Sequence, residues 1–271
     1  RSGGRGSLVD IRIRGVNGNG TLVLIDGVPS NSPTLGSFNI SDLLIDNVER
    51  VEVLRGAGSV LYGTDAMGGV INIITKKGKG DPFLKINSDG GSFGTFKETV
   101  LSGGAIGDFD YSLSISRIDS EGRFKNDDYE DFNISSNIGY NITDKMVIRH
   151  ILKTVDSEKG LPIEVFGSQT FDVNQRMENR FILNSVEFDR KYGTIGGEFN
   201  NMWADFKVQV SLLDTREKFF DPEDSGEVFP FIYTSDIITR KFVTTTQYSM
   251  GYGDLINFSL GFEYKDDIGD L

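Results

Sequence analysis

The chain has 271 residues, of which 38% are hydrophobic and 25% charged, proportions typical of a folded protein rather than a disordered one. Its net charge of −12 argues against a nucleic-acid partner, because phosphate binding needs a basic face. It has no Cys, which excludes disulfides and thiolate chemistry, and no apolar run of roughly 18 residues that would predict a transmembrane helix.

Residues 1–77 have the pattern of a mixed α/β segment. Residues 9–14 alternate as a strand does, and Asn17-Gly18-Asn19-Gly20 is a hairpin turn signal, so residues 21–26 are expected to return as a second strand. Ser41 is a candidate N-cap for a short helix through Asp46. Two further strands are predicted, over residues 48–54 and 70–75.

From Asp81 onward the sequence alternates strictly between apolar and polar residues. The alternating runs are about ten residues long, enough to cross an outer membrane when tilted. We predict roughly nine antiparallel strands in a meander, with those near residues 85 and 190 least clear. The side chains expected to face lipid include Phe109, Leu113, Ile134, Ile138, Phe258 and Phe262, and those expected on the opposite face include Ser112, Ser135 and Ser259.

The connections between these strands fall into two classes. Residues 107–108, 143–144 and 253–254 read as tight turns, whereas residues 119–130, 156–176 and 217–236 read as long polar loops. Short turns on one side and long loops on the other are typical of a transmembrane β-barrel. A soluble sandwich shows the same alternation along its strands, but its turns need not be sorted in this way.

Three patterns imitate catalytic or metal-binding signatures. Gly56-Ala57-Gly58 suggests a dinucleotide loop, but Leu61 stands where that fingerprint needs a third Gly. Gly90-Gly91-Ser92-Phe93-Gly94 matches a hydrolase elbow but lacks the helix that must follow, and the single His150 lies mid-strand. The acidic residues of the long loops could hold Ca²⁺, or could simply be solvated; they are Asp127, Asp128, Asp221 and Asp224.

The first 77 residues contain a specific run of motifs. They are Ile13-Arg14-Gly15, Val23-Leu24-Ile25-Asp26-Gly27-Val28-Pro29, Val48-Glu49-Arg50-Val51-Glu52-Val53-Leu54-Arg55-Gly56, Ser59-Val60-Leu61-Tyr62-Gly63 and Ala66-Met67-Gly68-Gly69-Val70-Ile71-Asn72-Ile73-Ile74-Thr75. In order, spacing and identity this segment resembles the plug of TonB-dependent outer-membrane receptors, most closely their cobalamin and colicin-receptor branch. Ala57 departs from the family, which usually has Pro there.

The resemblance implies a β-class fold in two parts. Residues 1–77 would be the C-terminal part of an α/β plug domain, and residues 78–271 the first strands of a transmembrane β-barrel. Since a plugged barrel has about 22 strands, we expect the chain to be an internal portion of a longer protein. The residues expected to form plug–barrel contacts are Arg14, Gly15, Asp26, Gly27, Glu49, Glu52, Arg55, Gly56, Tyr62, Gly63, Gly68 and Gly69.

The resemblance also implies an active importer of the bacterial outer membrane. Such a receptor binds a small metal chelate, a ferric siderophore or cobalamin, and TonB with its inner-membrane energising complex then rearranges the plug. We expect substrate to meet the loop after Pro29, at Asn31, Ser32, Thr34 and Ser37. The other partner is outer-membrane lipid; no cofactor is implied apart from Ca²⁺ in the loops, and no catalytic residue. The alternative is a passive porin-like or adhesive barrel, against which the folded N-terminal segment argues.

Overall fold

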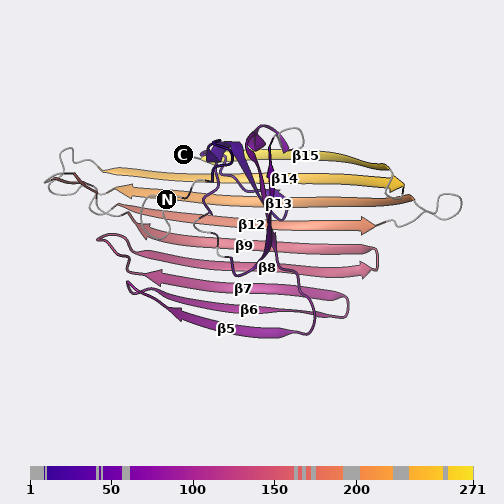
Figure 1. The fold of residues 1–271 in the computed structure, drawn as a ribbon, viewed down its shortest axis with the longest axis horizontal. Helices are drawn as coiled ribbons and strands as arrows, with labels where there is room; N and C mark the ends of the chain where they lie inside the picture. The colour runs from indigo at the N-terminus through magenta and orange to yellow at the C-terminus, as the bar shows by residue number, and fades with distance from the viewer. Residues whose placement is uncertain are drawn as a thin grey trace.

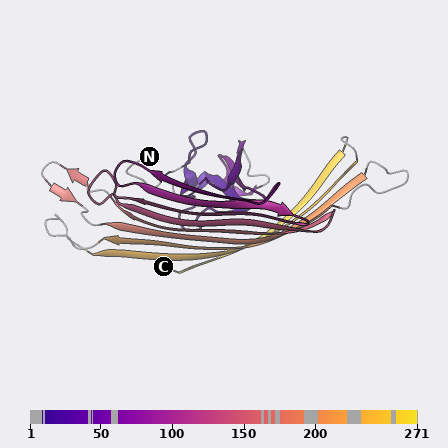
Figure 2. The same ribbon diagram turned by 90° about the horizontal axis from the view of Figure 1, so that it is seen from below.

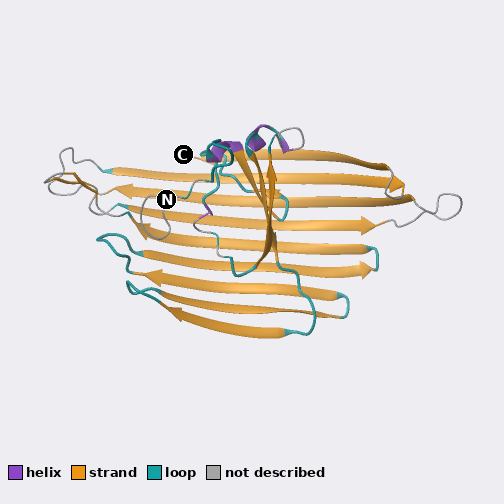
Figure 3. Cartoon of the chain, in the orientation of Figure 1, coloured by secondary structure: helices purple, strands orange, loops and turns teal. Residues whose placement is uncertain are grey.

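The computed structural model describes residues 9, 11–40, 43, 45–56, 62–161, 164–166, 169–171, 175–191, 202–221, 232–252 and 256–270. Almost all of this chain is strand or loop (Figure 3), arranged as one large sheet and one small sheet. No helix in these ranges is both long and apolar enough to cross a membrane.

The large sheet has nine strands in the order β15-β14-β13-β12-β9-β8-β7-β6-β5, and every neighbouring pair is antiparallel (Figure 1). This confirms the predicted meander. The strands are β5 (Phe83–Gly90), β6 (Phe96–Ile106), β7 (Phe109–Ser120), β8 (Tyr129–Thr143), β9 (Met146–Gly160), β12 (Arg176–Lys191), β13 (Met202–Asp221), β14 (Tyr233–Tyr252) and β15 (Ile256–Asp270). A short hairpin, β10 (Glu164–Phe166) and β11 (Gln169–Phe171), interrupts the sequence between β9 and β12.

The two faces of the large sheet follow the alternation of the sequence. Ser112 and Ser135 are buried on the inner face, whereas Ile138 and Phe109 are exposed on the outer face. Successive side chains of a strand point to opposite faces, so a single register sorts small polar residues inward and rings outward. Ser259 also lies on the inner face, as expected, because its Oγ is 3.0 Å from Ser249 Oγ of β14; it is exposed because β15 is the edge strand.

Several strands are longer than the ten residues predicted. β13 and β14 have 20 residues each, and both extend into the segment expected to be a loop at 217–236. At roughly 3.3 Å per residue such strands reach far beyond a hydrocarbon core of about 30 Å. Cross-strand ion pairs, Arg216 with Asp236 and Arg240 with Asp214, occupy the outer face of this projecting part. Pairing between charged neighbours lets the ladder continue where the apolar pattern has ended.

The small sheet lies on the concave side of the large one (Figure 2) and has the order β2-β1-β4-β3. Its strands are β1 (Thr21–Ile25), β2 (Val28–Pro29), β3 (Val48–Arg55) and β4 (Gly69–Thr75), and β1 pairs in parallel with β4. Every residue of β1 is buried, as expected for a short, continuously apolar strand between two neighbours. Ile25 and Val28 pack against Leu183 and Leu213 of the large sheet in one apolar cluster.

The N-terminal prediction of a hairpin over residues 9–26 is wrong. β1 is already paired with β2 on one edge and β4 on the other, so no edge remains for residues 9–14. The tight turn lies instead at Arg14 and Gly15, both with positive φ, between the bridged residues Ile13 and Val16. Residues Gly18–Gly20 form the 3₁₀ helix η1, and Thr64–Ala66 form a second, η3. The helix expected over 41–46 falls partly on Ser41, Asp42 and Leu44, which lie outside the described residues.

Candidate functional site

The small sheet is attached to the large sheet through side chains of the inner face. Asn47, just before β3, is buried and bridges two strands: Ser112 Oγ of β7 donates to Asn47 Oδ1 at 2.7 Å, and Asn47 Nδ2 donates to Ser135 Oγ of β8 at 3.0 Å. Beside it, Lys97 of β6 forms an ion pair with Asp46 at 2.8 Å. Two consecutive residues therefore connect to three strands of the large sheet.

A second attachment is a continuous chain of hydrogen bonds. The Asp26 carboxylate accepts from the Thr75 amide at 2.9 Å and from Thr75 Oγ1 at 2.7 Å, and Thr75 Oγ1 accepts from Asn137 Nδ2 at 2.8 Å. Arg149 then donates to Asn137 Oδ1 at 2.6 Å and forms a bidentate pair with Asp110. We call this attachment, together with the Asn47 bonds, the seam.

Burial shapes the electrostatics of the seam on its inner side. The pKa of Asp26 is raised above its ordinary value of 3.8, chiefly because burial penalises the charged form, although both hydrogen bonds from Thr75 act in the opposite direction. Asp26 also offers its backbone carbonyl to Gln209 Nε2 of β13, at 3.1 Å. Asp26 and Gly27 form the tight turn between β1 and β2, both with positive φ, which places that carbonyl against the large sheet.

Above the seam, a cavity of about 330 Å³ separates the loop after β2 from the large sheet. Its apolar lining comes from both sides: Leu35, Phe38 and Leu43 on one, and Val155, Met177 and Phe181 on the other. Phe38 and Phe181 meet edge to face, with ring centroids 6.0 Å apart. The strand residues of this lining lie in the halves of β9 and β12 next to the long connection 161–175, so the cavity is on the long-loop side.

The four residues expected to meet substrate lie in this loop but differ in what they can offer. Asn31 is buried, and its side chain is fully used by the backbone of Thr21, Val23 and Gly36. It therefore shapes the loop, and its own carbonyl accepts from Lys241 of β14 at 3.0 Å. Ser32 bonds within the loop, to Thr34 Oγ1. Ser32 and Ser37 line the cavity, and Thr34 is exposed.

The charged residues of β3 form ion pairs within their own part of the chain. Its side chains are largely exposed, and among the described residues Glu49 pairs with Lys79 at 3.0 Å and Glu52 with Arg50 at 2.8 Å. These partners lie in the same segment or just after it, not on the strands of the large sheet. The reason is topological, because β3 is the edge strand of the small sheet.

The remaining expected contact residues have mixed positions. A Cβ at Gly56 would lie 3.9 Å from Arg14 Nη1, so Arg14 approaches the segment's own backbone rather than the large sheet. Tyr62 is exposed, and Gly63, which has positive φ, is the N-cap residue of η3. Gly68 and Gly69 lie against Val16 and Leu54, where a side chain would collide, so their roles are in packing of the small sheet. The contacts expected of Gly15 and Arg55 with the barrel stay predictions.

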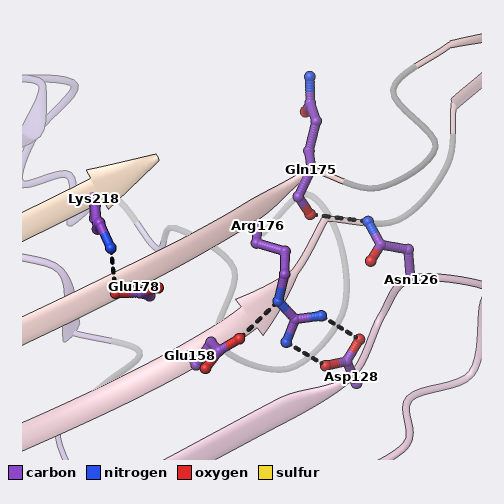
Figure 4. Close-up of polar contacts among 7 residues, drawn as sticks. All are labelled: Asn126, Asp128, Glu158, Gln175, Arg176, Glu178 and Lys218. Carbon is purple, nitrogen blue, oxygen red and sulfur yellow. Dashed lines mark hydrogen bonds and ion pairs between the residues drawn. The ribbon is translucent and has the colours of Figure 1, made fainter. Parts of the chain in front are cut away.

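The calcium expectation is not supported by the described residues, among which no three His, Cys, Asp or Glu side chains converge. Asp127 is buried, and one of its carboxylate oxygens accepts from the amides of Arg123 and Phe124. Asp128 is held by Arg176, which also bonds Glu158 at 2.7 Å (Figure 4). The protein's own donors thus occupy these two carboxylates. Asp221 accepts from Gln175 Nε2 at 3.0 Å, and Asp224 lies outside the described residues.

The catalytic look-alikes have structural explanations. Residues 91–95 form the turn between β5 and β6, with Phe93 and Gly94 at positive φ, and strand follows where a nucleophile elbow needs a helix. His150 Nε2 contacts Asn184 Oδ1 at 2.8 Å on the outer face of the sheet. The Gly56-Ala57-Gly58 pattern falls mostly outside the described residues.

Sequence reasoning missed the polar residues that make the seam. Asn47, Thr75 and Asn137 carry no charge, and none was among the residues expected to contact the barrel, although Thr75 ends the last of the plug motifs. The only signal for Asn137 was its phase, since it shares the inner face with Asn133 and Ser135. Asn47 precedes β3 and Thr75 is the last residue of β4, and nothing local marks either as a contact residue.

This architecture can be compared with known proteins. The family described as TonB-dependent Receptor Plug Domain matches residues 1–70. Residues 1–70 belong to the plug-domain family of TonB-dependent receptors. The small sheet is therefore the plug, and the nine strands are barrel wall in the bacterial outer membrane.

Relatives and solved structures agree with this membership. The vitamin B12 transporter BtuB of Photobacterium profundum is 38% identical over 107 residues, which is 40% of this chain and 18% of the relative. BtuB of Vibrio vulnificus is 48% identical over 75 residues, 28% of this chain and 12% of the relative. The chain thus spans less than a fifth of these relatives.

Two solved structures share the fold across nearly the whole chain. The siderophore receptor PiuA from Acinetobacter baumannii has a TM-score of 0.70 at 18% identity, covering 100% of this chain and 41% of that one. The copper transporter OprC has a TM-score of 0.75 at 14% identity, covering 97% of this chain and 42% of that one. At these identities the likeness concerns the fold of plug and wall.

Proposed function

We propose that this receptor imports a scarce metal chelate, of the ferric siderophore or cobalamin type, by a TonB-driven rearrangement of its plug. In this proposal residues 1–77 are plug and residues 78–271 are the first portion of the barrel. Relatives that transport vitamin B12 and structural neighbours that are siderophore receptors support a chelate as cargo. TonB and its energising complex are the partners, and the proposal involves no covalent chemistry.

The observation that carries the proposal is the composition of the seam. Its direct plug-to-wall bonds join amides and hydroxyls, such as Asn47 with Ser112 and Ser135, and Thr75 with Asn137. A typical hydrogen bond contributes about 0.5–1.5 kcal/mol net, because water can replace either partner. A row of such bonds holds the plug at rest, yet mechanical work can break them one at a time as water enters.

A covalent tether across the seam tests this mechanism. The chain has no Cys, so Asn47→Cys with Ser135→Cys introduces the only thiol pair into this segment. These positions are in hydrogen-bond contact, and a short bis-thiol crosslinker can join them if the disulfide geometry is imperfect. We expect the tethered receptor, in the full-length protein, to bind chelate but not import it, and reduction of the disulfide to restore import.

The matched controls are the two single Cys variants, which should import under oxidising conditions. Import at the untreated rate by a receptor shown to be fully tethered would refute plug rearrangement in this region. In that case a passive pore, closer to a porin, would be the better account. The dependence of import on the proton-motive force distinguishes the two mechanisms independently: TonB-driven rearrangement of the plug requires it, and a passive pore does not.

A further inference from the structure

Lys153 of β9 is a buried cation that the seam does not use. Its side chain is 5% exposed on the inner face of the wall, and it lines the cavity above the seam. In the described part of the chain no hydrogen bond or ion pair reaches its ammonium group, which feels carboxylates only at a distance. An ammonium group removed from water without a partner is costly, by several kcal/mol for a buried ion.

The carboxylates that interact electrostatically with Lys153 already have other hydrogen-bond or ion-pair partners. They are Asp131, Asp26 and Asp46. Asp131 accepts from Tyr129 Oη and from Asn133, Asp26 accepts from Thr75, and Asp46 is paired with Lys97. In the described part of the chain, none of these three carboxylates forms a hydrogen bond or ion pair with Lys153. The ammonium group therefore lacks a partner because each of its potential partners is held elsewhere.

The rest of the cavity is suited to an apolar body. Phe38 and Phe181 form an edge-to-face pair in its lining, and Val155 lies two residues beyond Lys153 on the same face of β9. A volume of about 330 Å³ is within the range of small-molecule sites. Glu217 also lines the cavity, but it has an interaction partner of its own.

We propose that Lys153 is the anchor for an oxyanion, such as a carboxylate, of a ligand whose aromatic or apolar body fills the cavity beside the Phe38–Phe181 pair. This inference rests on the proposed function and deepens it, because it defines the substrate class as an amphipathic anion. The cavity lies on the long-loop side of the plug, so a ligand there contacts both the plug loop and the wall. Binding would place an anionic group beside the Asn47 part of the seam, since Lys153 is opposite Ser135 in the ladder.

The test measures the binding of small probes to the full-length receptor in lipid nanodiscs, with empty nanodiscs as the blank. The probes are 2-naphthoate and its neutral analogue naphthalene-2-methanol, and saturation-transfer NMR titration gives their dissociation constants. For 2-naphthoate we expect Lys153→Met to weaken binding by at least about tenfold, which corresponds to about 1.4 kcal/mol. The neutral analogue should bind wild type more weakly and should be insensitive to the substitution.

Two further variants complete the design. Lys153→Arg keeps the positive charge and should retain most of the 2-naphthoate affinity. Lys85→Met, on the exposed strand β5 and outside the cavity lining, is the matched control and should change nothing. Phe181→Leu should weaken both probes alike, because it removes apolar lining and leaves the charge.

Three results would overturn the inference. They are equal affinity of wild type for the two probes, unchanged 2-naphthoate binding in Lys153→Met, and an equal loss of both probes in that variant, which would indicate a collapsed cavity. These binding assays need no TonB. If the tethered receptor imported normally while probe binding still required Lys153, the plug mechanism would fail and the site would stand; the converse pair of results would reject the site alone.

Discussion

Asn137 Nδ2 on the wall donates a hydrogen bond to Thr75 Oγ1 of the plug, 2.8 Å away, and both residues are buried. This bond joins two systems that are each complete on their own side: Thr75 with Asp26 in the plug, and Asn137 with Arg149 and Asp110 in the wall. A break at this bond therefore separates plug from wall at this point without dismantling either side.

The first prediction concerns Asn137→Ala. This substitution removes the donor to Thr75 Oγ1 and the acceptor of one Arg149 N–H group. The loss of these two buried bonds should cost roughly 2 kcal/mol. Hydrogen exchange of the amides of β4 should accelerate by roughly thirtyfold, since local opening follows that free energy. Asn184→Ala is the matched control, because Asn184 bonds His150 on the outer face. Exchange in β4 that is equally slow in both variants would show that this bond does not hold the plug.

The second prediction concerns pH. Burial raises the pKa of Asp26, so the folded plug binds this proton more readily than the unfolded chain does. Its stability should therefore rise as the pH falls from neutral through the folded pKa toward 3.8, and the ionised form is the less favourable one. The free energy of unfolding of the wild type minus that of Asp26→Asn, both measured by calorimetry, should increase as the pH is lowered from 7 to 4.

Glu49 provides a control of opposite sign. Its pKa is lowered, chiefly by the hydrogen bond from Lys79, so what this contact contributes is lost as the pH falls. The free energy of unfolding of the wild type minus that of Glu49→Gln should decrease on acidification. The decrease should be small, because the Glu49–Lys79 pair is exposed. A flat or falling difference for Asp26→Asn would contradict the role of burial.

The third prediction concerns Gly69, the first residue of β4. Its φ is +154°, and a Cβ there would lie 2.5 Å from the Leu54 carbonyl oxygen, a backbone atom that cannot swing away. Gly69→Ala should therefore separate β3 from β4 and destabilise the plug by roughly 2–4 kcal/mol. Gly90→Ala, where a Cβ meets nothing within 4 Å, should change stability by less than about 0.5 kcal/mol. Equal thermal unfolding of the two variants would refute the steric argument.

Much of the wall could be predicted from the sequence. The alternation of Leu113 with Ser112, or of Ile138 with Asn137, decides which residues face outward, because the side-chain period of a strand is two and is local. The antiparallel meander follows from tight turns between neighbouring strands, as at residues 107–108. The lengths of β13 and β14 did not follow, because their outer ends are held by cross-strand ion pairs and not by apolar alternation.

The plug–wall contacts required the tertiary structure. The sequence pointed to Glu49 and Glu52 because charges are conspicuous, but β3 is an edge strand and these side chains pair with Lys79 and Arg50. The contacts come instead from the neutral Asn47 and Thr75, and from Asp46 through its ion pair with Lys97. Whether a polar group meets the wall depends on where its strand lies in the small sheet, which no local pattern encodes.

By itself, then, the sequence determined the receptor family, through the motifs of the plug, and the inward and outward faces of the barrel strands, through their alternation. Both are written in residues close together along the chain. Only the tertiary structure decided three further points. No edge of β1 is free to pair with residues 9–14, the side chain of Asn31 bonds the backbone of β1 and of its own loop, and Lys153 has no partner among the described residues. Each of these depends on which groups from distant segments are already bonded to one another. Asp26 accepts from Thr75 and Asp46 is paired with Lys97, so these carboxylates are not available to a neighbour such as Lys153.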